Sequence, residues 1–255
     1  MRRYFLLLLA ALALAGPSCK ILAGLPAKRQ LNEVIVIGTE HRAHLGNEVY
    51  TLESLEQILR RADPRYVLCE IPPDRFDHAW KGFVRSGEVS EPRVMLYPEF
   101  TEVLFPMALE GRYRMIPCSA WTESMAKRRR LLLEQWKTTR SADTRKVDDA
   151  QEKGNRQLEK EGLDDDPLAI HTARFDELVA ESMVPYEELF SRDLGAGGWT
   201  QINLAHYTLI SEALDEISGN GQRVIVMFGS QHKYRLRELL AQRDDIKLLR
   251  LGDLE

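Results

Sequence analysis

The sequence contains two short stretches of the same design, almost two hundred residues apart. The first, VIVIGTEH, runs from Val34 to His41, and the second, VIVMFGSQH, ends at His232. In each, a run of β-branched and apolar residues stops at a glycine, and a histidine follows three positions later. Unbroken apolar runs of this length are typical of buried parallel strands. The chain is therefore predicted to build the same strand, turn and histidine twice within one sheet.

Further apolar runs alternate with amphipathic segments. Strands are predicted at 33–38, 65–71, 113–118, 223–229 and 246–251, and helices at 51–62, 98–111 and 233–243. Thr51 and Ser54 offer a cap to the first of these helices, and Pro106 interrupts the second. Strand and helix in alternation, with short connections, is the signature of an α/β layer. The predicted fold class is α/β, with a mostly parallel central sheet flanked by helices.

The middle of the chain is different in kind. Residues 119–195 contain no convincing strand and are predicted to form a helical, partly polar insertion between the third and fourth strands of a single domain at 31–255. Eleven basic and ten acidic residues lie between Lys127 and Asp166. This mixture favours a solvated helical arm or a flexible excursion over a cationic surface for nucleic acid or lipid.

Residues 1–15 have the composition of a signal peptide. Two arginines precede a dozen apolar residues, too few for the ~20 that span a bilayer. We therefore expect export, to the periplasm or outside the cell, and no integral membrane segment in the mature chain. A lipid anchor at Cys19 is the weaker alternative, because Pro17 lies so close to the cleavage point.

Charge and cysteine content narrow the possible partners. Removal of the signal would take away two arginines. The remaining chain would have 33 of the 35 basic residues and all 39 acidic residues, so its net charge would be −6. A protein that binds nucleic acid needs a basic surface, so no nucleic-acid partner is expected. Cys69 and Cys118 each end an apolar run, and an oxidising compartment would permit a disulfide between them. A disulfide and two unpaired buried thiols both remain open.

Polar side chains follow three of the predicted strands. His41 and His232 come three residues after a glycine, and Glu70 comes directly before two prolines that turn the chain. Carboxyl ends of parallel strands share one edge of a sheet, where ligands bind in open α/β folds. Two imidazoles and a carboxylate at that edge suit a divalent metal ion or acid–base chemistry. His44 is a further candidate ligand.

Other patterns carry less weight. Asn203 and His206 lie one turn apart on a predicted helix, where they either reach the site or belong to a polar surface. The chain lacks the phosphate-binding GxxxxGK[ST] and GxGxxG patterns and the GxSxG nucleophile elbow. The sequence thus gives no support to nucleotide dependence or to the usual serine hydrolase chemistry.

Three segments, VIVIGTEHRAH, YVLCEI and VIVMFGSQHKYRLRELL, resemble the anchor segments of the TraB/TIKI superfamily, which includes PrgY-like proteins. Erythromycin esterases and ChaN-like haem-binding proteins are its more distant relatives. The resemblance covers the N-terminal third and the last forty or so residues. It implies that His41, Glu70 and His232 are the functional residues and that the activity is that of a metal-dependent protease. The polar middle and the PPDRFD segment depart from the family pattern.

The predicted function is therefore that of an exported hydrolase that acts on a peptide or amide bond. His41, Glu70 and His232 would hold a divalent metal ion or share the activation of water, and the partner would be a peptide or small-molecule substrate. Two alternatives stay open. One is a non-catalytic protein that sequesters a peptide signal or haem, and the other is a metal-independent, esterase-like hydrolase that uses a histidine base and Glu70.

Overall fold

The structure is a computed structural model that describes residues 30–163 and 166–254. The predicted signal peptide at 1–15 and the alternative anchor at Cys19 lie outside the described residues. Within the described part of the chain, no helix combines the length and the apolar character that crossing a membrane requires.

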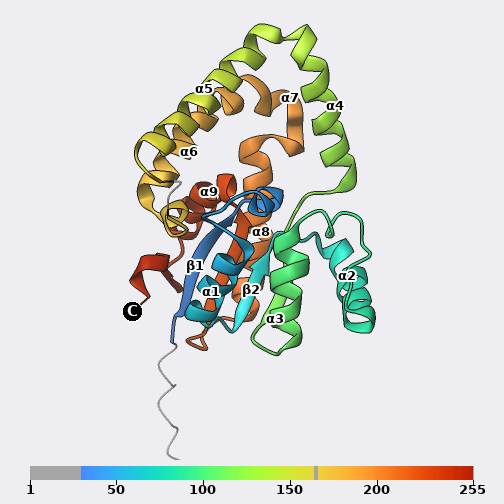
Figure 1. The fold of residues 1–255 in the computed structure, drawn as a ribbon, viewed down its shortest axis with the longest axis vertical. Coiled ribbons are helices and arrows are strands. Elements are labelled where there is room, and N and C mark those ends of the chain that lie inside the picture. The colour runs from blue at the N-terminus through green and yellow to red at the C-terminus, as the bar shows by residue number, and fades with distance from the viewer. Residues whose placement is uncertain (1–29, 164–165, 255) are drawn as a thin grey trace, which may run out of the picture.

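A parallel sheet of five strands forms the centre of the molecule (Figure 1). The spatial order is β3-β2-β4-β1-β5, and every neighbouring pair is parallel. The strands are β1 (Asn32–Thr39), β2 (Tyr66–Cys69), β3 (Arg114–Pro117), β4 (Arg223–Gly229) and β5 (Ile246–Leu249). The predicted α/β class is confirmed, and the two similar stretches of the sequence form adjacent strands, β1 and β4.

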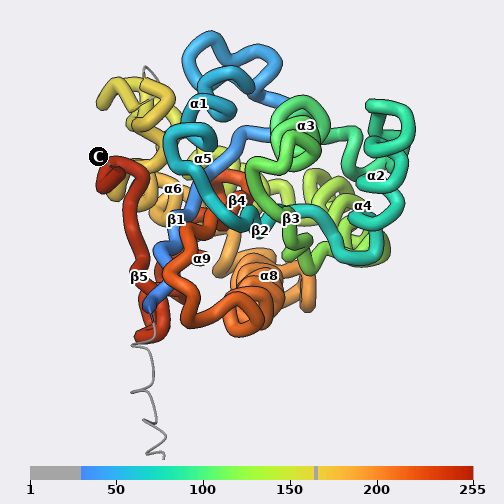
Figure 2. The backbone as a smooth tube through the Cα atoms, turned by 90° about the horizontal axis from the view of Figure 1, so that it is seen from below, coloured from blue at the N-terminus to red at the C-terminus, as the bar shows by residue number. Residues whose placement is uncertain are grey.

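Helices cover both faces of this sheet (Figure 2). In β1, Ile35 and Ile37 belong to one buried cluster, whereas Val34 and Val36 belong to the other, as expected for side chains that alternate across a strand. The first cluster includes apolar residues of α1 (Leu52–Ala62), α2 (Pro73–Ser86) and α3 (Phe105–Leu109). The second includes those of α8 (Trp199–Glu216) and α9 (Ser230–Leu240).

Local signals explain most helix boundaries. Thr51 accepts a hydrogen bond from the Ser54 amide at 3.1 Å and so caps α1, as predicted. A π-helical segment, Glu99–Leu104, leads directly into α3, and Pro106 lies in the first turn of α3. The second of the two prolines that follow β2 lies in the first turn of α2. Because proline fits the first turn of a helix, Pro73 begins α2 rather than ending regular structure.

The predicted insertion is present as a helical arm between β3 and β4, defined here as residues 119–195 (Figure 1). Its helices are α4 (Glu123–Thr139), α5 (Ser141–Lys160), α6 (Ala173–Tyr186) and α7 (Arg192–Leu194). The polar stretch forms the ordered helix α5, which packs along α6. On α6, Asp176 forms an ion pair with the buried Lys233 of α9, and this pair ties the arm to the sheet layer.

Cys69 and Cys118 are unpaired and buried. Strand register explains why they do not form a disulfide although β2 and β3 are neighbours. Cys69 pairs with Pro117, so Cys118 lies one position further along the chain. A shift of one residue turns a side chain to the opposite face of the sheet. Cys69 accordingly belongs to one buried cluster and Cys118 to the other.

The contact between α5 and α6 depends on Gly154. A Cβ atom at this position would lie 2.9 Å from the Cβ of Ser182, which cannot move without its backbone. We predict that Gly154→Leu separates the two helices, at a cost of about 1–3 kcal/mol, and that limited trypsin digestion then cuts first within α5. Glu159→Leu, at an exposed position of the same helix, is the control. Equal digestion patterns for the two variants would contradict this account.

Candidate functional site

The two Gly-x-x-His turns pack against each other, and each glycine makes room for the other turn. Strands β1 and β4 pair with Thr39 opposite Gly229. A Cβ at Gly38 would lie 3.0 Å from the Cα of Ser230, and a Cβ at Gly229 would lie 2.7 Å from Nε2 of His41. Side chains of any size at these positions would therefore push the two turns apart.

The backbone at His41 is unusual. Its φ angle is 52°, in the left-handed region that residues with a side chain seldom occupy. Such conformations persist where the surroundings enforce them, and they collect at functional sites. Here the conformation turns the imidazole back over the carboxyl end of β4. His232 reaches the same edge from the first turn of α9, which begins directly after β4.

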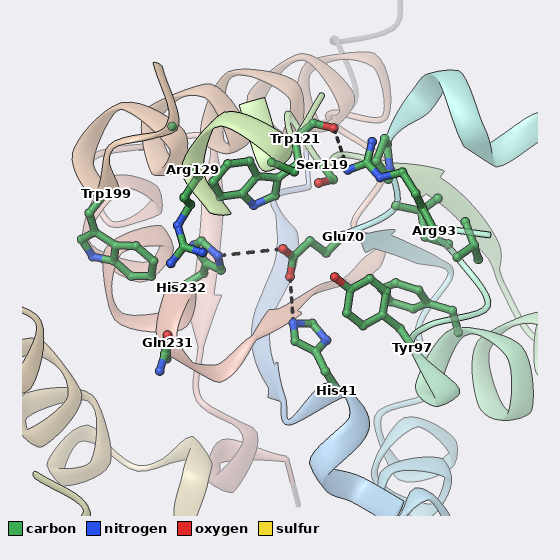
Figure 3. A pocket seen from close by; sticks show the side chains of 16 residues that line it. His41, Glu70, Arg93, Tyr97, Ser119, Trp121, Arg129, Trp199, Gln231 and His232 are labelled. Carbon is green, nitrogen blue, oxygen red and sulfur yellow. Dashed lines mark hydrogen bonds and ion pairs between the residues drawn. The ribbon is translucent and has the colours of Figure 1, made fainter. Parts of the chain in front are cut away.

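Glu70 lies between the two histidines (Figure 3). The carboxylate oxygen Oε2 accepts a hydrogen bond from the Gly229 amide at 2.8 Å and lies 3.7 Å from Nε2 of His41. The other oxygen, Oε1, lies 3.8 Å from Nε2 of His232. The three sequence-predicted residues thus come together at one edge of the sheet, from the adjacent strands β1, β2 and β4.

A buried carboxylate fixes the protonation of His41. Nδ1 of His41 lies 2.6 Å from Oε1 of Glu99, whose side chain is fully buried. Because an ionised carboxylate accepts hydrogen bonds and cannot donate them, Nδ1 carries the proton. In the neutral ring, Nε2 then has a free lone pair that faces Glu70.

The side-chain amide of Asn203 fixes the protonation of His232 in a similar way. The side-chain nitrogen of Asn203 donates to the Trp199 carbonyl at 2.8 Å, which directs the amide oxygen toward His232. Nδ1 of His232 lies 2.9 Å from that oxygen and must donate to it. Nε2 of His232 therefore also presents a lone pair to Glu70. The ring of Trp199 stacks on the imidazole with 4.6 Å between ring centroids.

His206 has the opposite arrangement of donor and acceptor. Its Nδ1 accepts a hydrogen bond from the Ala120 amide at 2.9 Å, so the proton of the neutral ring is on Nε2. Nε2 is buried and has no hydrogen-bond partner within the described residues. One ligand atom each from Glu70, His206 and His232 lie within 4.8 Å of one another. Distance alone would make these three a metal site, but His206 offers an N–H donor there instead of a lone pair.

His44 does not join the site, and the prediction that it is a ligand is wrong. It is buried, and both ring nitrogens have backbone partners. Nε2 accepts a hydrogen bond from the Glu40 amide at 3.0 Å, and Nδ1 donates to the Tyr50 carbonyl at 2.7 Å. His44 holds the turn that carries His41, and neither nitrogen is left for an ion.

Burial and charge separate the pKa values of these groups. Burial lowers the pKa of His41, but the Glu99 hydrogen bond and the negative charge of Glu70 outweigh it, so the pKa is raised overall. Burial holds the pKa of His232 well below its usual value and lowers that of His206 to about 3. Burial raises the pKa of Glu70, against the opposing effects of His41 and the Gly229 amide.

These side chains open into a cavity of about 280 Å³. His41, Glu70 and His232 form its floor, and aromatic rings and two arginines form its walls (Figure 3). The ring of Tyr97 lies 4.6 Å from that of His41, measured between centroids. Other lining residues are Arg93 from the loop after α2, Trp121 and Arg129 from the helical arm, and Trp199 from the start of α8.

Sequence reasoning missed several residues of the site. Glu99 lies in a segment predicted only as an amphipathic helix, and no local signal distinguishes its buried carboxylate from an exposed one. Asn203 and His206 are fully buried, and both contact His232, Asn203 through a hydrogen bond and His206 through its ring. Their spacing of one helical turn was the available signal. Comparison with protein-family models, curated proteins and solved structures gives no match for this chain.

We predict that replacing each of the two turn glycines with alanine has a different effect. In Gly229→Ala the new methyl group meets the end of the His41 side chain, which can swing away, so we expect a folded protein with a displaced His41. In Gly38→Ala the methyl group meets the Ser230 backbone, and we expect a loss of about 1–3 kcal/mol in unfolding free energy. Thermal melts and the imidazole NMR signals of His41 separate the two effects. An unchanged His41 signal in Gly229→Ala would contradict the packing described.

The carboxylate of Glu99 should control the titration of His41. Gln at position 99 keeps a hydrogen-bond acceptor but removes the charge that stabilises the imidazolium form, so the pKa of His41 should fall in Glu99→Gln. In the wild type we expect a value above the ordinary ~6.5. Imidazole NMR signals followed against pH measure both values. Glu102→Gln, at an exposed position of the same helical segment, should leave the pKa of His41 unchanged. If neither substitution changes the pKa of His41, the pairing of His41 with Glu99 is refuted.

Proposed function

We propose that this chain is a metal-dependent hydrolase of peptide or amide bonds, with His41, Glu70 and His232 as the ligands of a divalent cation. The observation that supports this most is the protonation pattern. In their neutral forms both histidines direct an unprotonated Nε2 toward Glu70, and both donate Nδ1–H to an oxygen behind them. Metal-binding histidines almost always have such an outer partner, which fixes the tautomer and the ring orientation.

The donor set is chemically suitable for catalysis. Two imidazoles and one carboxylate form the ligand set of several catalytic zinc sites and leave a further position for water or substrate. When bound, the cation would polarise a carbonyl group and lower the pKa of a water molecule. Imidazole and carboxylate ligands suit several divalent transition metals, so the ligands alone do not select one of them.

The chain's own groups supply the remaining chemistry. Burial raises the pKa of Tyr97, so its hydroxyl stays protonated and can donate a hydrogen bond. In Figure 3 this hydroxyl points into the cavity beside Glu70. Nε2–H of His206 is a second donor near Glu70 and His232. Donors held in place before the reaction are what a hydrolase needs to stabilise negative charge that develops on a carbonyl oxygen.

The resemblance to TraB/TIKI proteins agrees with this proposal, because the three resembling segments carry the three proposed ligands. It rests on those segments alone. The predicted export adds that the reaction would take place outside the cytoplasm.

A second candidate is a metal-independent hydrolase in which His41 is the general base. The 2.6 Å contact with Glu99 favours it, because a buried carboxylate orients the base in the same way in catalytic triads. The two candidates differ in their response to a chelator, which should abolish the first activity and spare the second.

Metal content after mild chelation and reloading with Zn²⁺, Mn²⁺ or Co²⁺ tests the proposal. We predict one tightly bound ion per chain in the wild type, and loss of that ion in His41→Asn and His232→Ala. Asn is chosen at position 41 because it tolerates the left-handed backbone. Hydrolysis of a short-peptide library, followed by mass spectrometry, should be lost in the same variants and, since the residues act as one unit, should fall no further in the double variant.

Two control variants show which histidines bind the ion. His206→Gln should keep the ion, because His206 offers no lone pair, and His78→Asn, at an exposed position, should be silent. Loss of the ion in His206→Gln with retention in His41→Asn would replace the proposed ligands with Glu70, His206 and His232. A wild type that binds no ion would refute the proposal.

A further inference from the structure

Two arginines line the cavity above the His–Glu site. Arg93 comes from the loop between α2 and the π-helical segment, and Arg129 comes from α4 of the helical arm. Figure 3 places Arg129 beside His232 and Arg93 on the side of Tyr97, with Trp121 between them. Both side chains are half-buried.

Neither guanidinium has an acidic partner. Within the described residues, no carboxylate lies within 4.0 Å of the guanidinium group of Arg93 or of Arg129, although many other arginines there form ion pairs. Removing a charge from water without a counter-charge costs free energy. Two unpaired guanidinium groups in one cavity therefore indicate that a ligand supplies the negative charge.

Each side chain is held in place by neutral groups. Nε of Arg129 donates to the Tyr186 hydroxyl at 2.9 Å, and the guanidinium lies 6.0 Å from the centroid of Trp121. These contacts leave the two terminal nitrogens of Arg129 for a ligand. Nη2 of Arg93 donates to the Trp121 carbonyl at 3.3 Å, while Nη1 is buried and lacks a partner within the described residues.

The charge of the cavity points to a single anion. Among the residues that line it, Glu70 is the one carboxylate, against the guanidinium groups of Arg93 and Arg129. One further negative charge would be balanced there, whereas a doubly charged phosphate would meet more repulsion from Glu70. A cation bound at Glu70 would strengthen the attraction for an anion.

Size and wall chemistry define the rest of the ligand. At about 280 Å³ the cavity is near the lower end for small-molecule sites. Tyr97, Trp121 and Trp199 provide aromatic surface around it. A small acid with an apolar or aromatic body, or the carboxyl-terminal end of a peptide, matches these walls.

We propose that the cavity selects substrates that carry a carboxylate, which pairs with Arg129, while Arg93 keeps the opposite wall positive. This inference names the substrate class of the proposed hydrolase and rests on that function. Carboxylate binding itself needs no catalysis, so it can be measured separately. An arginine side chain can bind a carboxylate through two parallel hydrogen bonds, which gives both strength and orientation.

Binding of 3-phenylpropanoate and of its neutral analogue 3-phenylpropan-1-ol is compared by calorimetry, on protein treated with chelator and on protein reloaded with Zn²⁺. Neither compound has a bond to hydrolyse. Hydrogen bonds to charged groups are worth about 1.5–3 kcal/mol, so the carboxylate should bind at least about tenfold more tightly. Inorganic phosphate, as a third probe, should bind more weakly than the carboxylate.

Three arginine variants show which guanidinium group causes the preference for the carboxylate. Arg129→Gln should abolish the preference for the carboxylate, Arg93→Gln should reduce it less, and Arg130→Gln, at an exposed position of the same helix, should preserve it. Circular dichroism and a thermal melt show whether each variant is folded. If a Gln variant at 129 unfolds, Arg129→Lys replaces it, and it should keep a weakened preference.

The wild-type comparison decides the matter without any variant. Equal affinity for the acid and the alcohol, or no binding of either, would overturn the proposal, and tighter binding of phosphate would overturn the choice of carboxylate. Because the chelated protein is measured too, a failure to bind metal leaves this result intact. A protein that binds metal but shows no preference for the acid would refute only the inference about substrate.

Discussion

The close approach of two backbone turns is the constraint on which the site depends. β1 and β4 are adjacent and parallel, so their carboxyl ends arrive side by side with a histidine just beyond each. Gly38 lets the turn after β4 come near, and Gly229 lets the ring of His41 lie against its own Cα. The Gly229 amide also donates to Glu70. The repeated pattern is therefore one structural unit in two parts, each part completing the other.

Hydrogen bonds behind the site decide what each imidazole can do. His41, His206 and His232 are chemically identical side chains, yet two offer a lone pair and one offers a proton. The difference comes from the partner of Nδ1, which is a carboxylate, an amide oxygen or a backbone N–H. Proximity alone would group His206 with His232 and Glu70. The donor and acceptor pattern instead groups His41 with them, and this distinction underlies the proposed metal site.

The helical arm contributes to the site as well as to the outline of the molecule. Trp121 and Arg129 reach the cavity from the arm, and Trp199 follows it directly at the start of α8. The ion pair between Asp176 and the buried Lys233 anchors the arm one residue after His232. The proposed ligands thus come from the ends of the sheet strands, whereas the arm supplies one part of the cavity wall and the segment between β2 and β3 supplies another.

The sequence by itself determined the architecture and the main members of the site. Apolar runs fixed the strands, and the ends of parallel strands placed His41, Glu70 and His232 at one edge, because that geometry follows from local patterns. Tertiary structure decided what periodicity cannot encode. Strand register sent Cys69 and Cys118 to opposite faces, and packing buried Glu99, Asn203 and His206 next to the two histidines. Backbone partners took both nitrogens of His44. The protonation, pairing and burial of these side chains depend on residues that are distant in the sequence. A local sequence pattern cannot predict which distant residues become neighbours in the fold.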